Sequence, residues 1–120
     1  MRSKYHAKKV YVNGEMYDSQ HEYERWLQLC LLQRAGKISD LQRQVTYELI
    51  PTQREPDTIG PRGGVKPGKF LEHGVTYTAD FVYVQDGQTV VEDAKGYRTD
   101  DYVIRRKLML WIHGIRIKEV

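Results

Sequence analysis

Apolar residues that recur every three or four positions predict two helices in this chain of 120 residues. The first is expected from about 20 to 35, where Gly36 provides a stop, and the second from 99 or 100 to 113, where Gly114 does the same. The residues expected to be buried are Tyr23, Trp26, Leu27, Cys30 and Leu31 on the first helix and Val103, Ile104, Leu108, Trp111 and Ile112 on the second.

Alternation of apolar and polar residues predicts the strands. The run 41–50 alternates over its whole length and is expected to form a half-buried strand, and the run 115–120 alternates in the same way. A short hairpin is expected over 9–18, because Asn13 and Gly14 lie between two β-rich runs and favour a type I′ turn.

The strongest hairpin signal in the chain is Asp86-Gly87, which also lies between two β-rich runs. If these are the two loop residues, the pairing register places Asp80 directly opposite Asp93. Side chains alternate along a strand, so Lys95 is expected on the same face as Asp93. Two carboxylates and an ammonium group should therefore converge.

Carboxylates that face each other across a strand pair repel, because their Cβ atoms are only about 5 Å apart. A cation between Asp80 and Asp93 would relieve that repulsion. Mg²⁺ suits such a site, since it usually takes one or two carboxylates and leaves other positions to water and substrate phosphate. Hydrolysis of a phosphodiester fits this chemistry, with Lys95 orienting the attacking water or stabilising the developing charge. The alternative interpretation is a surface hairpin with solvated charges.

The order of predicted elements is helix, strand, two hairpin strands, helix, strand. Three antiparallel strands followed by a helical crossover to a parallel strand give a central mixed sheet flanked by helices, an α+β fold. At 14.1 kDa the chain suits one domain, residues 1–120, with a basic arm and hairpin over 1–18.

Asp80, twelve intervening residues and then Asp93-Ala94-Lys95 resemble the signature of the PD-(D/E)xK nuclease superfamily, with Ala79 where the signature has proline. The chain as a whole is similar to a phage-encoded family of small proteins placed in that superfamily. The resemblance implies a restriction-endonuclease-like αβββαβ core, in agreement with the order of elements.

The resemblance also implies a function. It implies an endodeoxyribonuclease that uses Mg²⁺, with Mn²⁺ able to substitute. Proteins of this kind act in phage recombination or replication, on branched DNA such as Holliday junctions. Cutting a junction would require two active sites and therefore a homodimer.

Glu22 has two interpretations that do not exclude each other. Ser19 and Glu22 form the pattern of a capping box, in which the glutamate reaches back to the amide at the start of the helix. Members of the resembled superfamily often carry an extra acidic residue on the first core helix, near the metal. The catalytic residues implied are Asp80, Asp93, Lys95 and Glu22, of which Asp80, Asp93 and Glu22 would bind metal.

Basic residues elsewhere are candidates for contact with a nucleic acid backbone. The stretch 51–69 has no period and is rich in glycine and proline, so we expect a flexible basic loop there, either a flap over nucleic acid or an insertion without function. Lys107 interrupts the apolar face of the second helix, and it either reaches the edge of the core or points at the carboxylate site. The candidate nucleic-acid-binding residues are Lys107, Arg106, Arg105, Lys8, Lys9, Lys66 and Lys69.

Composition and charge narrow the class of protein. The net charge of +3 weakly favours a polyanionic partner. Cys30 is the single cysteine, so an intramolecular disulfide and a cysteine-based zinc cluster are excluded, and the four histidines are too scattered for a zinc hydrolase. No apolar run approaches the ~20 residues of a membrane span. We therefore expect a cytoplasmic protein, in the cytoplasm of the host if a phage encodes it.

Two other functions fit the same residues. The first is a catalytically inactive DNA-binding module of this fold, against which the intact Asp80, Asp93 and Lys95 argue. The second is an RNA-directed nuclease, because discrimination between RNA and DNA rests on contacts to the 2′-hydroxyl that no short motif encodes.

Overall fold

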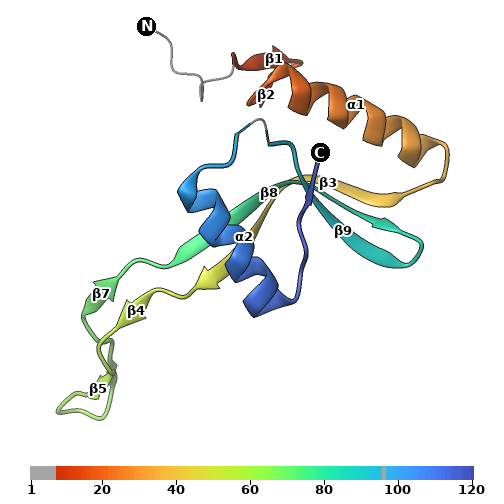
Figure 1. Cartoon of the computed structure of the whole chain (residues 1–120). Helices are drawn as coiled ribbons and strands as arrows, with labels where there is room; N and C mark the ends of the chain where they lie inside the picture. The colour runs from red at the N-terminus through yellow and green to blue at the C-terminus, as the bar shows by residue number, and fades with distance from the viewer. Residues whose placement is uncertain (1–7, 96) are drawn as a thin grey trace, which may run out of the picture.

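A four-stranded mixed sheet with one helix on each side forms the body of the molecule (Figure 1). The computed structural model describes residues 8–95 and 97–120, so most of the expected basic arm lies outside the described residues. The elements of the body are α1 (Gln20–Arg34), β3 (Ser39–Ile50), β8 (Val75–Gln85), β9 (Gln88–Asp93), α2 (Asp100–His113) and β10 (Lys118–Glu119).

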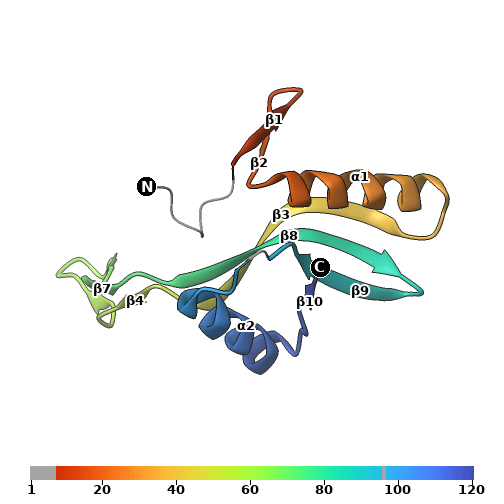
Figure 2. The same ribbon diagram turned by 45° about the horizontal axis from the view of Figure 1, so that its top comes forward.

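The sheet has the predicted topology. Its strand order is β10-β9-β8-β3, with β3, β8 and β9 antiparallel and β10 parallel to β9. Figure 2 shows α1 on one side of the sheet and α2 on the other. The α+β fold expected from the order of elements is therefore confirmed. The last strand is shorter than predicted, because Ile115 and Ile117 pack against the core before β10 begins.

Both predicted hairpins are present. Strands β1 (Val10–Val12) and β2 (Glu15–Tyr17) pair around Asn13 and Gly14, and β8 pairs with β9 around Asp86 and Gly87. The φ angles of these four turn residues are 52°, 80°, 51° and 76°, as a type I′ turn requires. These turns fix the strand registers without any help from distant residues.

The predicted limits of α1 are confirmed, but the predicted buried face is only partly right. Tyr23, Trp26 and Cys30 are half-buried, and Trp26 packs against Phe81. Ser19 caps the helix and Gly36 follows it with a φ of 76°. The face against the sheet contains Leu29, while Leu27 and Leu31 on the predicted face are exposed. The helix is rotated because the buried face also holds charged residues, which neutralise their charge on partners from the sheet and so behave as core residues.

The same error affects α2. Thr99 caps this helix and Gly114 ends it in the left-handed conformation, as predicted. Tyr102 and Met109 are the buried residues, whereas Trp111 of the predicted stripe is 85% exposed. The inward face of α2 is partly polar, so the apolar pattern alone does not identify it.

Two clusters of buried residues hold the helices to the sheet. Met109 of α2 packs in one cluster with Tyr77 and Ala79 of β8, and Leu29 of α1 packs in the other with Phe81. Strict alternation would place Tyr77, Ala79 and Phe81 on one face of the strand. The buried face of β8 therefore changes between Ala79 and Phe81, and the residue at the change is Asp80.

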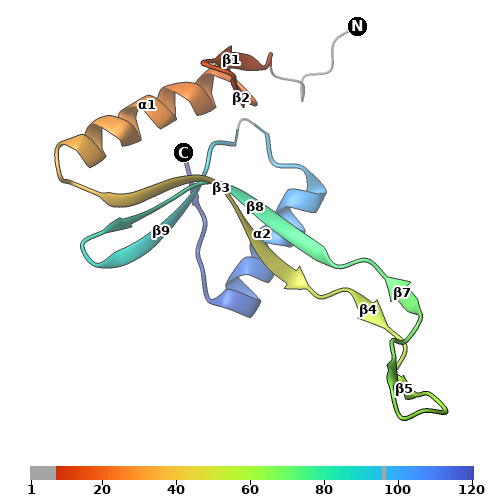
Figure 3. The ribbon, with the colours of Figure 1, turned by 180° about the vertical axis from the view of Figure 1, so that it is seen from behind.

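The stretch 51–69 is not the structureless loop that its composition suggested. It forms most of a narrow two-stranded ribbon, residues 51–73, which we call the finger and which projects away from the body (Figure 3). Its strands are β4 (Gln53–Arg54), β5 (Thr58–Ile59), β6 (Val65–Lys66) and β7 (Phe70–Glu72), with β4 paired to β7 and β5 paired to β6. The short strands are separated by prolines and glycines, so no alternating run was visible in the sequence.

Neither helix in the described part of the chain is long and apolar enough to cross a membrane.

Candidate functional site

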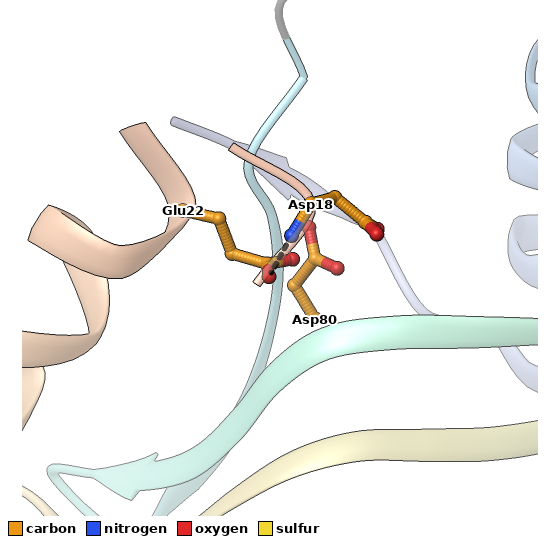
Figure 4. Close-up of side chains that lie close together, drawn as sticks. All are labelled: Asp18, Glu22 and Asp80. Carbon is orange, nitrogen blue, oxygen red and sulfur yellow. Dashed lines mark hydrogen bonds between the residues drawn. The ribbon is translucent and has the colours of Figure 1, made fainter. Parts of the chain in front are cut away.

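Acidic side chains gather where the N-terminus of α1 meets the middle of β8 (Figure 4). Asp80 comes from β8, Glu22 from the first turn of α1, and Asp18 from the residue before the helix cap. Asp93, at the end of β9, lies beside them. The site therefore draws on three separate segments of the chain.

The predicted arrangement of Asp80, Asp93 and Lys95 is present. Phe81 pairs with Glu92, so the register places Asp80 across from Asp93. Both aspartates are buried, and Asp93 is only 1% exposed. Lys95 Nζ lies 3.1 Å from Asp93 Oδ1, although this buried oxygen accepts no hydrogen bond from the described residues.

Neutral donors hold the two aspartates in place. Asp80 Oδ2 accepts a hydrogen bond from the backbone N–H of Ala94 at 2.9 Å, and the side-chain amide of Gln44 lies 3.4 Å from its other oxygen. The hydroxyl of Tyr77 donates to Asp93 Oδ2. These donors orient the carboxylates, but none of them supplies a positive charge.

Burial and mutual repulsion make both aspartates weak acids. Burial, together with the carboxylate of Glu22, raises the pKa of Asp80 to about 6. Burial and the charge of Asp80 raise the pKa of Asp93 to about 7, against the opposing effects of Tyr77 and Lys95. Without an added cation, the site therefore resists carrying its full negative charge at neutral pH.

Glu22 combines the two roles that the sequence left open. The Ser19 hydroxyl accepts a hydrogen bond from the Glu22 N–H at 3.1 Å, as an N-cap does. Glu22 Oε2 accepts a hydrogen bond from the N–H of Asp18 at 3.0 Å, one residue before the amide that a standard capping box uses. Glu22 is also buried beside Asp80, so the cap positions a carboxylate of the acidic site.

Asp18 is a member of the site that sequence analysis missed. One oxygen from each of Asp18, Glu22 and Asp80 lies within 4.8 Å of the other two. Oxygens on opposite sides of a Mg²⁺ ion are about 4.2 Å apart, and those around Ca²⁺ are somewhat further apart. The three oxygens thus need little movement to bind one ion. The sequence signal for Asp18 was its place directly before the cap that positions Glu22.

Glu92, the neighbour of Asp93, is a buried acid whose charge is balanced by cationic partners. Its side chain points to the α1 side, where Arg25 makes two hydrogen bonds to it at 2.8 and 2.7 Å. The hydroxyl of Tyr83 also donates to it, and Lys118 Nζ lies 3.9 Å away. Glu92 is therefore a structural residue despite its place beside the predicted site.

Asp80 lacks this compensation. Among the described residues it has no ion pair, and its charged neighbours Glu22 and Asp93 are both acids. The cations at the edge of the site pair with its other acids: Lys95 with Asp93 at 3.1 Å, Arg43 with Glu22 at 3.7 Å, and Lys9 with Asp18 at 4.0 Å. Asp80 is thus the acid of the site that lacks a cation partner among the described residues.

Arg43 is a second residue that the sequence did not single out. It lies on β3, and its guanidinium carbon is 3.9 Å from the ring centroid of Tyr17. Its NH2 group also donates to the backbone carbonyl of Met16 at 3.1 Å. Arg43 fastens the β1–β2 hairpin to the sheet, and so it fixes the position of Asp18.

The three candidate nucleic-acid-binding residues of α2 differ from one another in burial and in partners. Arg105 donates to the carbonyl of Thr76 at 2.9 Å, and Arg106 lies 3.3 Å from Glu119. Both arginines are half-buried and hold α2 to the sheet, which leaves them less free to contact a nucleic acid than predicted. Lys107 is exposed, and its role toward substrate stays a prediction.

The other four candidates lie on exposed surface. Lys66 and Lys69 are on the finger, which projects away from the body that holds the acidic cluster (Figure 3). Lys8 and Lys9 precede β1, and Lys9 Nζ is 4.0 Å from Asp18. Lys9 is therefore the candidate that lies directly beside the acidic site.

Comparison with known proteins yields one match. Residues 2–115 match the model of a family described as a protein of unknown function, DUF1064. No curated protein and no solved structure matches the chain.

Proposed function

The chain belongs to the DUF1064 family, and from its acidic site we propose that it is a Mg²⁺-dependent endonuclease that hydrolyses phosphodiester bonds in DNA. The main support is Asp80, a buried carboxylate whose charged neighbours are the acids Glu22 and Asp93. A divalent cation would balance that charge and favour the ionised form of each acid. The contrast with the fully paired Glu92 argues against a merely structural role.

The donor set suits a hard cation. All four candidate ligands, Asp18, Glu22, Asp80 and Asp93, offer carboxylate oxygens, which Mg²⁺, Mn²⁺ and Ca²⁺ prefer over nitrogen or sulfur. When bound, the ion would polarise the scissile phosphoryl group and lower the pKa of the attacking water. Asp18 and Glu22 come from the α1 side of the site and Asp93 from the hairpin, so Asp80 would be the ligand between them.

Lys95 has the chemistry to serve the phosphate. Its ammonium lies 3.1 Å from Asp93 Oδ1 and 4.6 Å from the ring centroid of Tyr102, and these two contacts hold it at the site. An ammonium group donates hydrogen bonds and accepts none, so Lys95 would orient the attacking water or stabilise the charge that develops on the phosphoryl oxygens. Water would form the new bond to phosphorus while the bond to the leaving oxygen breaks.

The natural substrate in this proposal is branched DNA. The support is the resemblance to phage proteins of the PD-(D/E)xK superfamily, which the residues Asp80, Asp93 and Lys95 carry. Two cuts across a four-way junction would require a homodimer, with one acidic site from each copy.

A cleavage assay tests the proposal. Purified protein is incubated with duplex, single-stranded, flap and four-way-junction DNA, and with RNA, in Mg²⁺, Mn²⁺ or EDTA. We expect DNA cleavage that EDTA abolishes and that Asp80→Asn and Lys95→Ala each lower by at least about a hundredfold, the scale for loss of one preorganised electrostatic group.

Glu22 has a matched control on its own helix. Glu22→Gln should lower cleavage, whereas Glu24→Gln removes an exposed carboxylate two residues away and should leave it unchanged. Cleavage that survives EDTA or Asp80→Asn would contradict the mechanism. Binding without cleavage under every condition would instead support the inactive DNA-binding module, and cleavage of RNA alone would support the RNA-directed nuclease.

A further inference from the structure

Hydrogen bonds give the finger a regular two-stranded structure. Its strands are joined by backbone hydrogen bonds, among them Glu55 N–H to the Lys69 carbonyl at 2.8 Å and Gly60 N–H to the Gly64 carbonyl at 2.7 Å. Asp57 accepts a hydrogen bond from the N–H of Gly68 at 3.0 Å. A Cβ atom at Gly68 would lie 1.7 Å from the carbonyl oxygen of Glu55, so only glycine allows the two strands to lie this close.

The finger has no core of its own. No residue from 51 to 73 is buried, and the apolar side chains of Ile59 and Val65, which pair across the ribbon, are 79% and 71% exposed. An isolated two-stranded ribbon of this kind is marginally stable in water. The finger therefore contributes little to the stability of the body, and its shape suits contact with another molecule.

The dimensions of the whole molecule also indicate surface that is available for contact with another molecule. Its radius of gyration is 19.1 Å, compared with about 14 Å for a compact domain of this length. Its accessible surface is 9097 Å², compared with about 6,700 Å² for a compact protein of this mass. The excess is larger than the ~800 Å² that each partner buries in a standard interface.

The charge of the finger identifies the kind of partner. Over residues 51–73 the finger has four cations and three acids, and the acids are Glu55, Asp57 and Glu72. The stretch from Thr58 to Leu71 contains no acid and three of the cations, Arg62, Lys66 and Lys69. All three are exposed, and the described residues offer them no ion pair within 4.0 Å. The stretch 58–71 of the finger is therefore basic, and a basic stretch fits a polyanion. The major groove of duplex DNA is wide enough to take a two-stranded ribbon.

We propose that the finger lies in a groove of duplex DNA and so makes a double-stranded arm beside the cleavage point a required part of the substrate. This inference rests on the proposed function for the existence of a cleavage point. Strand β8 links the two sites, because Asp80 is eight residues from Glu72 at the base of the finger. Eight residues of strand span about 26 Å, which is the length of about eight base pairs.

DNA binding in EDTA tests the finger without any cleavage. The affinities of the full-length protein for a labelled duplex of about three helical turns and for the matching single strand are measured across a salt series. The finger variant is Arg62→Ala/Lys66→Ala/Lys69→Ala. The control variant, Arg34→Ala/Lys37→Ala/Arg116→Ala, removes the same net charge from exposed positions on the body.

For the duplex, the fall of log affinity with log salt should be less steep in the finger variant, by about 3 units of slope. Each lost phosphate contact reduces the steepness by about 1. The control variant should leave the slope unchanged, and the single strand should not distinguish the variants. Shortening the duplex to fewer than about eight base pairs should abolish the effect of the finger variant. A further variant in which Asn-Gly replaces residues 51–74 should stay folded by circular dichroism and bind like the finger variant.

Three results would overturn the proposal. The first is equal salt slopes for the wild type and the finger variant. The second is a reduction of the salt slope in the control variant as large as that in the finger variant. The third is a finger variant that binds duplex normally but is a monomer by light scattering where the wild type is a dimer. That result would mean that the finger contacts a second copy of the chain. Absence of cleavage in Mg²⁺ with a clear finger effect on binding would instead contradict the nuclease function alone.

Discussion

At the scale of single residues, acids on the paired strands β8 and β9 have opposite roles because of their partners. Glu92 is fully buried but holds Arg25 in two hydrogen bonds, so its charge is balanced. Asp80 is also buried, at 8% exposed, but its charged neighbours Glu22 and Asp93 are acids. An uncompensated buried carboxylate costs free energy, and proteins keep such a group where it binds a cation or reacts.

The raised pKa values of Asp80 and Asp93 predict how stability depends on pH in the metal-free protein. Both pKa values rise from 3.8, to about 6 for Asp80 and to about 7 for Asp93. Between about pH 4 and pH 7 the folded state therefore holds more protons than the unfolded state, and the free energy of unfolding falls as the pH rises. Between pH 5 and pH 8 the loss should be on the order of 4 kcal/mol, and it should level off above about pH 8. Urea unfolding in EDTA at pH 5 and pH 8 measures it.

The control for this experiment is the double variant Asp80→Asn/Asp93→Asn. It removes the two groups whose pKa values are raised, so its stability should change less between pH 5 and pH 8 than that of the wild type. Greater stability of the wild-type protein at pH 8 than at pH 5 in EDTA would contradict the assignment of raised pKa values.

At the scale of elements, local signals set the ends of each helix and tertiary contacts chose its buried face. Ser19 and Thr99 accept the capping hydrogen bonds that their positions predicted. The buried face of α1 is only partly the predicted one, because Glu22 is buried and Arg25 is half-buried with their charges paired, while Leu31 is 61% exposed. Charge pairing across the sheet, which is invisible in a helical pattern, determined the rotation of the helix.

The rotated face of α1 predicts unequal effects of two leucine substitutions. Leu29→Ala should lower the free energy of unfolding by about 2 to 5 kcal/mol, because it leaves a cavity beside Phe81 and Ile38. Leu31→Ala, on the same helix but exposed, should change it by less than about 0.5 kcal/mol. Urea unfolding of both variants at one pH measures the difference. Equal losses would show that α1 buries the face predicted from the apolar pattern.

At the scale of the whole molecule, the sheet joins three chain segments into one acidic site. Asp18 and Glu22 lie about 60 residues before Asp80 in the sequence, and Arg43 connects their hairpin and helix to β3. The finger extends from the end of β3 and the start of β8, which lie side by side because the two strands are antiparallel. The same two strands therefore carry both the acidic site and the finger. This arrangement would let one duplex contact both.

The proposed binding of a metal ion at the acidic site predicts stabilisation of the whole fold. A ligand that binds only the folded state adds about 2.7 kcal/mol at a hundredfold excess over its Kd. Mg²⁺ or Mn²⁺ should therefore raise the melting temperature by several degrees at pH 8 and by less at pH 5, where protons compete for Asp80 and Asp93. Thermal unfolding by circular dichroism measures the shift.

Two controls separate specific binding from a general salt effect. The Asp80→Asn/Asp93→Asn variant should lose most of the stabilisation, and NaCl at matched ionic strength should not produce it. A melting temperature that is unchanged by Mg²⁺, Mn²⁺ and Ca²⁺ at pH 8 would argue against a cation site.

The sequence by itself determined the features that depend on neighbouring residues. The two-residue turns set both hairpin registers, so Asp80, Asp93 and Lys95 meet for local reasons and were predictable. The tertiary structure decided which helix faces are buried, that Asp18 and Glu22 reach Asp80, and that the stretch 51–69 is part of a ribbon. These outcomes depend on charge pairing and packing between segments that are far apart in the chain, and no local pattern of apolar residues records such contacts.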